Sequence, residues 1–186
     1  SHINGVRDND QVFDGSQETF PKILQSAGYE TAMIGKWHLK SEPTGFNYWK
    51  ILKGQGEYYN PLIVDSAGER NVEGYVTDII TNLAIETLEN RDKDKPFAML
   101  LHHKAPHRNW MPNLKYLGAF KGKKFPLPET FYDDYSTRSL AAKESDMRID
   151  NMFLTWDMKL RPGDIDKETG SGGSGQVSGI IRDRVE

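Results

Sequence analysis

The sequence predicts an α/β fold with a largely parallel sheet and flanking helices. Two amphipathic patterns, residues 17–27 and 76–88, each lead into a short apolar run, residues 29–35 and 97–101. Apolar side chains that recur every three to four residues indicate helices, whereas short uninterrupted apolar runs are typical of strands buried on both faces. Helices and strands that alternate along a chain are the mark of α/β proteins.

The first helix is predicted over residues 17–27. Four apolar side chains share one of its faces: Phe20, Ile23, Leu24 and Ala27. Pro21 suits the first turn of this helix, and Gly28 suits the position after its last turn. Residues 29–35 should then form the first core strand.

A pair of short strands joined by a turn is predicted between residues 46 and 65. Aromatic and β-branched residues fill residues 46–52 and 58–65, and Gly54-Gln55-Gly56 lies between them. This pattern is typical of a hairpin beside the main sheet. We expect the turn to be structural, with Gln55 and Asn60 as further candidates for contacts to a ligand.

The second helix, residues 76–88, has the clearest pattern in the chain. Its apolar stripe consists of Val76, Ile79, Ile80, Leu83, Ala84 and Leu88. A charged turn follows, and residues 97–101 should form a fully buried strand of the parallel-sheet type. Another helix is predicted near residues 139–150.

The predicted domain organisation is one partial catalytic domain followed by a linker and a tail. We place the domain over residues 1–160, a flexible Gly/Ser-rich linker over 161–176 and the tail over 177–186. The composition of residues 170–175 is typical of a flexible linker, whether native or engineered.

Composition and charge exclude several classes of function. The net charge of −3 provides no general attraction to a polyanion, so we expect no nucleic-acid partner. The longest apolar runs are far too short to cross a bilayer, and the mean hydropathy is −0.68. The chain has no cysteine, which removes disulfides, thiolate metal sites and a cysteine nucleophile. Its localisation stays undetermined.

Cationic and imidazole side chains follow both core strands. Lys36-Trp37-His38 comes directly after the first of these strands, and residues 102–110 follow the last one with three histidines, Lys104, Arg108 and Trp110. In open α/β sheets, ligands bind beyond the carboxyl ends of the strands. If the two strands are parallel neighbours, both clusters face one crevice.

These clusters contain donors and no carboxylate, which suits a tetrahedral oxyanion such as sulfate or phosphate. A lone lysine or histidine at a strand end is more often a solvated side chain, but two such clusters together favour a site. A zinc site of His103 and His107 would need a helix, which Pro106 disfavours. Trp37 and Trp110 suit either packing or stacking on a sugar ring.

The stretch from Gly28 to His38, GYETAMIGKWH, resembles the second signature of the type I sulfatase family. In that signature Gly-Tyr, a Ser or Thr, a small or aliphatic residue, Gly-Lys, an aromatic residue and a His recur in order. The segment from Lys104 to Trp110, KAPHRNW, is similar to the Lys-Ala-Pro-His segment of the same family, especially its carbohydrate-sulfatase branch near the glucosamine-6-sulfatases. The resemblance extends over about residues 1–160.

This resemblance implies an alkaline-phosphatase-like sandwich and hydrolysis of a sulfate ester. In the family, a formylglycine made from Cys or Ser attacks sulfur as its hydrate, while a calcium ion held by Asp and Asn side chains clamps the sulfate. Lys36 would match the lysine that contacts sulfate, His38 the histidine that helps to expel it, and His107 the histidine that assists the leaving oxygen. Lys104, Arg108, Trp110 and Asn60 are expected to bind substrate.

The sequence also departs from the family pattern. It lacks the Cys/Ser-x-Pro/Ala-x-Arg motif, the early Asp-Asp pair and the late Asp-Asn/His-Gly segment. We therefore expect an internal fragment without nucleophile or metal ligands, inactive alone and prone to self-association through uncovered sheet edges.

The resulting hypothesis is that the chain is part of a sulfatase that acts on a sulfated carbohydrate. The resemblance to the family suggests a periplasmic, secreted or lysosomal location, which the chain itself leaves unknown. A noncatalytic sulfated-glycan-binding module and a phosphoester or phosphonate hydrolase of the same fold are the alternatives.

Overall fold

The computed structural model describes residues 3–108 and 110–145. It divides into two compact units, Ser1–His107 and Arg108–Glu186. The predicted boundaries of the linker and the tail lie outside the described residues, so that part of the predicted organisation stays a prediction.

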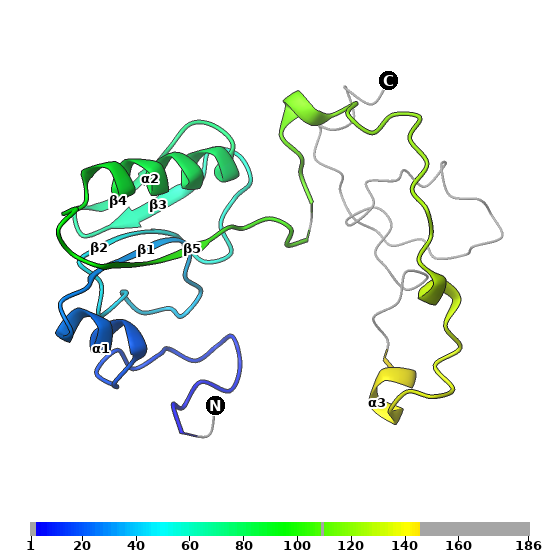
Figure 1. Cartoon of the computed structure of the whole chain (residues 1–186), viewed down its shortest axis with the longest axis horizontal. Coiled ribbons are helices and arrows are strands. Elements are labelled where there is room, and N and C mark those ends of the chain that lie inside the picture. Colours follow the sequence, from blue (N-terminus) through cyan, green and yellow to red (C-terminus); the bar gives the residue numbers. More distant parts are fainter. Residues whose placement is uncertain (1–2, 109, 146–186) are drawn as a thin grey trace. The chain divides into compact units, whose positions relative to one another are not determined.

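The first unit is a five-stranded mixed sheet with one helix on each face (Figure 1). Its elements follow in the order α1 (Phe20–Ser26), β1 (Glu30–Lys36), β2 (Tyr48–Leu52), β3 (Leu62–Asp65), β4 (Gly68–Asn71), α2 (Val76–Asn90) and β5 (Phe97–His102). The strand order is β4-β3-β2-β1-β5, in which β1 pairs in parallel with both β2 and β5 while β2–β3 and β3–β4 are antiparallel. The α/β prediction is confirmed.

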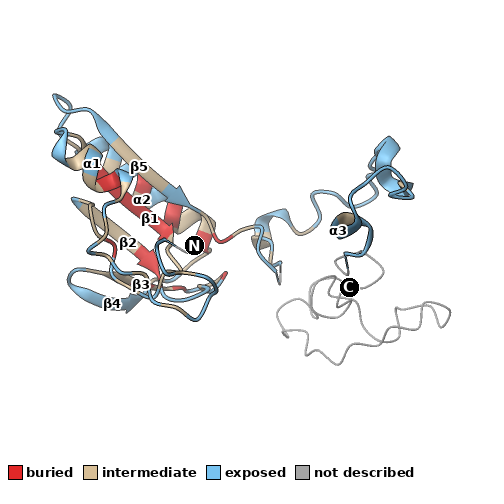
Figure 2. Ribbon diagram, turned by 90° about the horizontal axis from the view of Figure 1, so that it is seen from below, coloured by how far each residue is buried: buried red, intermediate tan, exposed pale blue. Residues whose placement is uncertain are grey.

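The core lies between the sheet and α2. Six large side chains have at most 1% of their surface exposed: Met33, Ile34, Leu52, Ile63, Val76 and Ile80. Figure 2 shows the buried residues gathered on the central strands and on the sheet-facing side of α2. Because β1 is covered on both faces, its burial runs unbroken from Thr31 to Gly35, as an apolar central strand requires.

Most of the expected elements are present with small shifts at their ends. α1 is shorter than its predicted range and has Pro21 in its first turn, and Gly28 follows it with φ +90°. The predicted hairpin is formed by β2 and β3, although residues 58–61 precede β3 as a loop that contains an isolated bridge from Tyr59 to Tyr75.

One expectation about a strand is wrong, and one strand was not predicted. β5 is not fully buried, since 44% of Phe97 and 40% of Leu101 are exposed. Among the described residues β5 pairs only with β1, so it is an edge strand whose faces are partly open. β4 was not expected at all, because its sequence Gly-Glu-Arg-Asn is polar and fully exposed, and backbone pairing with β3 alone forms it.

The described part of the second unit consists of short elements. These are η1 (Leu114–Tyr116), η2 (Glu129–Tyr132) and α3 (Leu140–Lys143), with Ser139 accepting a hydrogen bond from the backbone N–H of Ala142 at the start of α3. α3 is much shorter than the predicted helix at 139–150 and ends before Glu144; residues 146–150 lie outside the described part. No helix in the described ranges is long and apolar enough to cross a membrane.

Candidate functional site

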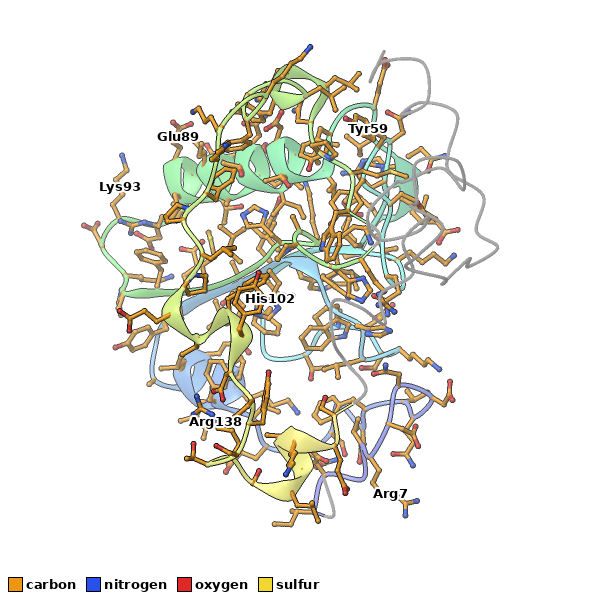
Figure 3. All side chains as sticks on the ribbon, turned by 90° about the vertical axis from the view of Figure 1, so that its right-hand side faces the viewer. Arg7, Tyr59, Glu89, Lys93, His102 and Arg138 are labelled. Atoms are coloured by element: carbon orange, nitrogen blue, oxygen red, sulfur yellow. The ribbon has the colours of Figure 1, made fainter. Side chains whose placement is uncertain are left out.

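The carboxyl ends of β1 and β5 lie side by side. The two strands pair in parallel from Glu30 opposite Phe97 to Gly35 opposite His102, and the ring Nδ1 of His102 lies 3.2 Å from the carbonyl oxygen of Lys36. His102, labelled in Figure 3, therefore marks the edge where both clusters begin. The expectation that the two strands are parallel neighbours is confirmed.

Gly35 permits this close approach. Its φ is +105°, and a Cβ built on it would lie 1.9 Å from the carbonyl oxygen of His102. No residue with a side chain fits at such a distance, and the positive φ is unfavourable for L residues in any case. Glycine at this position is what brings the segment after β1 against the segment after β5.

Gln55 joins the first two candidate residues. The Lys36 ammonium Nζ donates to the side-chain oxygen Oε1 of Gln55 at 2.5 Å, and the Nε2 of Gln55 lies 3.2 Å from the ring Nε2 of His38. His38 has φ +50°, so the chain turns sharply after β1 and brings its ring back toward the hairpin turn. One amide therefore bridges an ammonium and an imidazole.

Lys104 belongs to the same cluster from the β5 side. Only 7% of it is exposed, and its ammonium donates to the backbone carbonyl of Gln55 at 3.1 Å. The ammonium also lies 4.9 Å from the centre of the Tyr58 ring, and a cation over an aromatic face is stabilised electrostatically. The hairpin turn thus contacts cations from both strand ends.

Tyr58 also anchors the loop that carries His107. Its hydroxyl donates to the carbonyl oxygen of His107 at 2.7 Å, and the backbone N–H of His107 donates to the carbonyl of Lys104 at 3.0 Å. The loop follows a cis peptide bond between Ala105 and Pro106, and no helix forms there. The i, i+4 helical geometry that a zinc site of His103 and His107 would need is therefore absent.

The electrostatics favour an anion at this edge. Burial lowers the pKa of Lys36, and burial together with the charge of Lys36 lowers the pKa of Lys104, with Glu57 acting in the opposite direction. Burial lowers the pKa of His38 most, followed by the positive charges of Lys36, Lys40 and His107. The charge of Lys36 thus acts on both His38 and Lys104, and the charge of His107 acts on His38.

Neither Lys36 nor Lys104 forms an ion pair with a carboxylate within the described ranges, in contrast to Lys40, Lys53 and Lys95. Desolvated cations without carboxylates are costly unless a ligand supplies the negative charge. This arrangement can bind a tetrahedral oxyanion, and its imidazoles can exchange protons with that anion or with a leaving group.

A cavity of about 510 Å³ adjoins the cluster. The residues that line it include His38 and Gln55 together with Trp37, Trp49 and Ile51. Pockets that bind small molecules combine apolar or aromatic walls with a few polar groups, and this one does so next to the cations.

The remaining candidates have other positions. Asn60 is exposed with φ +50°, and its amide oxygen accepts a hydrogen bond from the backbone N–H of Gly74 at 2.8 Å, so its visible role is to hold the loop before β3. Arg108 and Trp110 belong to the second unit, and their contacts with a substrate stay predictions.

A family model described as Sulfatase matches residues 2–156. The chain belongs to the sulfatase family. The fold described above is therefore that of a sulfatase.

Curated relatives of this sulfatase chain are much longer than it is. The chain is 55% identical over 164 residues to an N-acetylglucosamine-6-O-sulfatase of Bacteroides thetaiotaomicron. The aligned region covers 86% of the chain and 29% of that protein. It is also 30% identical over 129 residues to the human N-acetylglucosamine-6-sulfatase. That aligned region covers 61% of the chain and 23% of the human protein. The chain thus spans less than a third of either relative.

A solved structure of a protein in complex with its substrate D-glucosamine-2-N,6-O-disulfate is also similar. Its TM-score is 0.76 at 52% sequence identity, and the match covers 91% of this chain and 35% of that chain. The likeness agrees with the expected alkaline-phosphatase-like sulfatase fold.

Sequence reasoning treated Gln55 only as a possible ligand contact and assigned Tyr58 to structure. A glutamine in a glycine-rich turn and a tyrosine near a strand are common surface and packing residues. Their roles depend on the folding of β2 and β3 against the end of β1, which brings residues 55 and 58 to the strand-end edge.

Proposed function

We propose that the full-length protein hydrolyses sulfate esters of a sulfated carbohydrate, with Lys36, His38 and His107 in its active site and Lys104 binding the sulfate. The observation that carries this proposal is a pair of desolvated lysines, which form no ion pair with a carboxylate among the described residues, together with two imidazoles at one edge of a sulfatase-family sheet.

Lys36 and Lys104 would neutralise the sulfate group. A sulfate ester carries one negative charge, and further charge develops on the departing oxygen as its bond to sulfur breaks. Donors that are already in place stabilise this charge without reorganising during the reaction. Lys36, at the end of a rigid strand, and Lys104, with 7% exposure, meet that requirement.

The two imidazoles would donate and accept protons. A sugar hydroxyl is a poor leaving group unless it is protonated, and His107 is proposed to supply that proton. His38 is held toward its neutral form, since burial and nearby positive charges lower its pKa, so it suits the role of a base.

A sugar ring is proposed to occupy the adjoining cavity. Indole faces such as those of Trp37 and Trp49 suit the apolar faces of sugar rings, while Gln55 and His38 supply polar contacts beside the anion site. The names of the similar proteins favour a 6-O-sulfated glucosamine or N-acetylglucosamine as that sugar.

Calcium and formylglycine, which the family implies, do not fit the cluster described here. Its side chains are ammonium and imidazole groups, whereas calcium requires oxygen ligands, and no group of three or more His, Asp or Glu side chains that could hold a metal is found in the described ranges. The sequence has no cysteine and no Ser-x-Pro/Ala-x-Arg motif from which a formylglycine could form. We propose that both groups come from outside these 186 residues, and the steps above involve only this chain's own side chains.

Sulfate release by the full-length protein tests this function. The substrates are N-acetylglucosamine 6-sulfate, its 6-phosphate analogue and a galactose 6-sulfate, and released sulfate or phosphate is measured by ion chromatography. Turnover of the glucosamine 6-sulfate is expected to fall about a hundredfold or more in Lys36→Met and His107→Ala.

Lys93→Met is the matched control. Lys93 is exposed in the loop before β5 and lies at the periphery of the view in Figure 3, so its loss should leave turnover unchanged. Binding of the sulfated sugar without release by the wild-type protein would support the binding module instead. Preferential release of phosphate would support the phosphoester hydrolase.

A further inference from the structure

Gln55 sits between the two groups whose proton states matter most at this edge. Its side-chain oxygen lies 2.5 Å from Lys36 Nζ, and its side-chain nitrogen lies 3.2 Å from His38 Nε2. Its backbone carbonyl accepts a hydrogen bond from Lys104, which ties the turn to the β5 side as well. Gln55 is the residue of the hairpin turn that contacts both Lys36 and His38.

The direction of each hydrogen bond follows from chemistry. An ammonium can only donate, so the atom of Gln55 that faces Lys36 must be the amide oxygen. The amide NH2 then faces His38, and because an NH2 group can only donate, the Nε2 of His38 must accept. An imidazole that accepts at Nε2 is neutral and carries its proton on Nδ1.

We infer that Gln55 is a positioning residue that holds His38 neutral, in the Nδ1–H tautomer, with Nε2 kept as the atom that accepts a proton. This inference rests on the proposed function for its catalytic meaning, but the tautomer itself does not. The donor set leaves no other assignment, since reversing the amide would place two donors, Lys36 and the NH2 group, against each other.

The surroundings of His38 support the same state. Lys36 and Lys40 flank it along the chain, His107 lies in the loop after β5, and the charges of all three act against a positive charge on its ring. The adjoining cavity is also lined by three charged residues, Glu42, Lys53 and Glu69. Two of them form an ion pair, with Lys53 Nζ 2.5 Å from Glu69 Oε2.

Imidazole nitrogen chemical shifts report the tautomer directly. The experiment uses the full-length protein labelled with ¹⁵N-histidine, with the His38 signals assigned by their loss in His38→Asn. Wild-type His38 above its pKa is expected to show a protonated Nδ1 and an unprotonated Nε2. Gln55→Met removes the donor at similar size, so both nitrogens should move toward the averaged shifts of an unbiased tautomer mixture.

Gln55→Glu reverses the contact, because a carboxylate accepts from both Lys36 and His38. The pKa of His38 is expected to rise by about one to three units, as a nearby opposite charge favours the protonated ring. Gln25→Met and Gln25→Glu are matched controls, since Gln25 lines a cavity with Tyr29 and Glu30 at the opposite end of β1. Both should leave the His38 signals unchanged.

Two results would overturn the inference: a wild-type ring protonated at Nε2, or a Gln55→Met spectrum identical to that of the wild type. The wild-type spectrum decides the first even if a Gln55 variant fails to fold. Sulfate release by the wild-type protein is measured in parallel. A confirmed tautomer without turnover would leave the inference standing and refute the proposed function, whereas turnover with the other tautomer would do the reverse.

Discussion

Replacing Gly35 by alanine should destabilise the protein by an amount that the structure allows to be divided into two parts. The first part is backbone strain, because Gly35 has φ +105°, and a positive φ costs an L residue about 1–2 kcal/mol. The second part is steric, since the new Cβ would lie 1.9 Å from the His102 carbonyl oxygen and 2.8 Å from its carbon. Overpacking of this kind costs about 1–3 kcal/mol, so the total is about 2–5 kcal/mol.

Gly28 provides a control that isolates the steric part. Its φ is +90°, and a Cβ built there meets nothing within 4 Å, so Gly28→Ala should cost only the strain, about 1–2 kcal/mol. Urea unfolding of the full-length protein, followed by circular dichroism, gives both free energies of unfolding. Turnover should also fall more in Gly35→Ala, because β1 and β5 must separate at the edge that carries Lys36. Equal losses of stability in the two variants would refute the close-approach argument.

The other predictions concern the charges of the cluster. Lys104→Met should change the free energy of unfolding by no more than about 1 kcal/mol, because it removes a buried cation together with its contacts, yet it should raise the KM for the sulfate ester about tenfold or more; an unchanged KM would show that Lys104 has only a structural role. The pKa of His38 in the folded protein lies below its usual value of 6.5. As the pH falls, the unfolded chain therefore binds a proton at His38 before the folded protein does. His38 thus makes the free energy of unfolding decrease as the pH falls below about 6.5. Urea unfolding of the wild type and of His38→Asn between about pH 7 and pH 5 should show a shallower decrease in the variant, and parallel curves would contradict this sign.

The parts of the fold that the sequence predicted well are those where one local pattern decides the outcome. β1 is apolar on both faces because it is central, and α2 repeats its apolar residues with the helical period. β5 has the same kind of sequence as β1 but is an edge strand in the described residues, so apolar composition alone overstated its burial. β4 has no strand signal of its own and depends on β3.

The sequence singles out the charged residues of the candidate site more clearly than its neutral ones. Lysine and histidine at the ends of two strands are uncommon enough to stand out. Gln55 was only a weak candidate for a ligand contact, and its link between Lys36 and His38 depends on the hairpin folding back on β1. Asn60 was singled out by residue type as well; its amide oxygen accepts a hydrogen bond from the backbone N–H of Gly74, and its contact with a substrate stays a prediction.

Burying the Lys104 ammonium with no carboxylate partner among the described residues lowers the stability of the folded protein. A lysine that is 93% buried could be neutralised by a carboxylate, yet Lys104 has a backbone carbonyl and an aromatic face as its closest partners. Neutral partners of this kind orient an ammonium without cancelling its charge, so most of its attraction remains for an incoming anion, although Glu57 partly offsets the charge of Lys104. Gln55 acts in the same way on Lys36, because an amide orients the ammonium without cancelling its charge. A carboxylate at either place would stabilise the unliganded protein and compete with the substrate, so neutral partners around desolvated cations are what a preorganised oxyanion site requires.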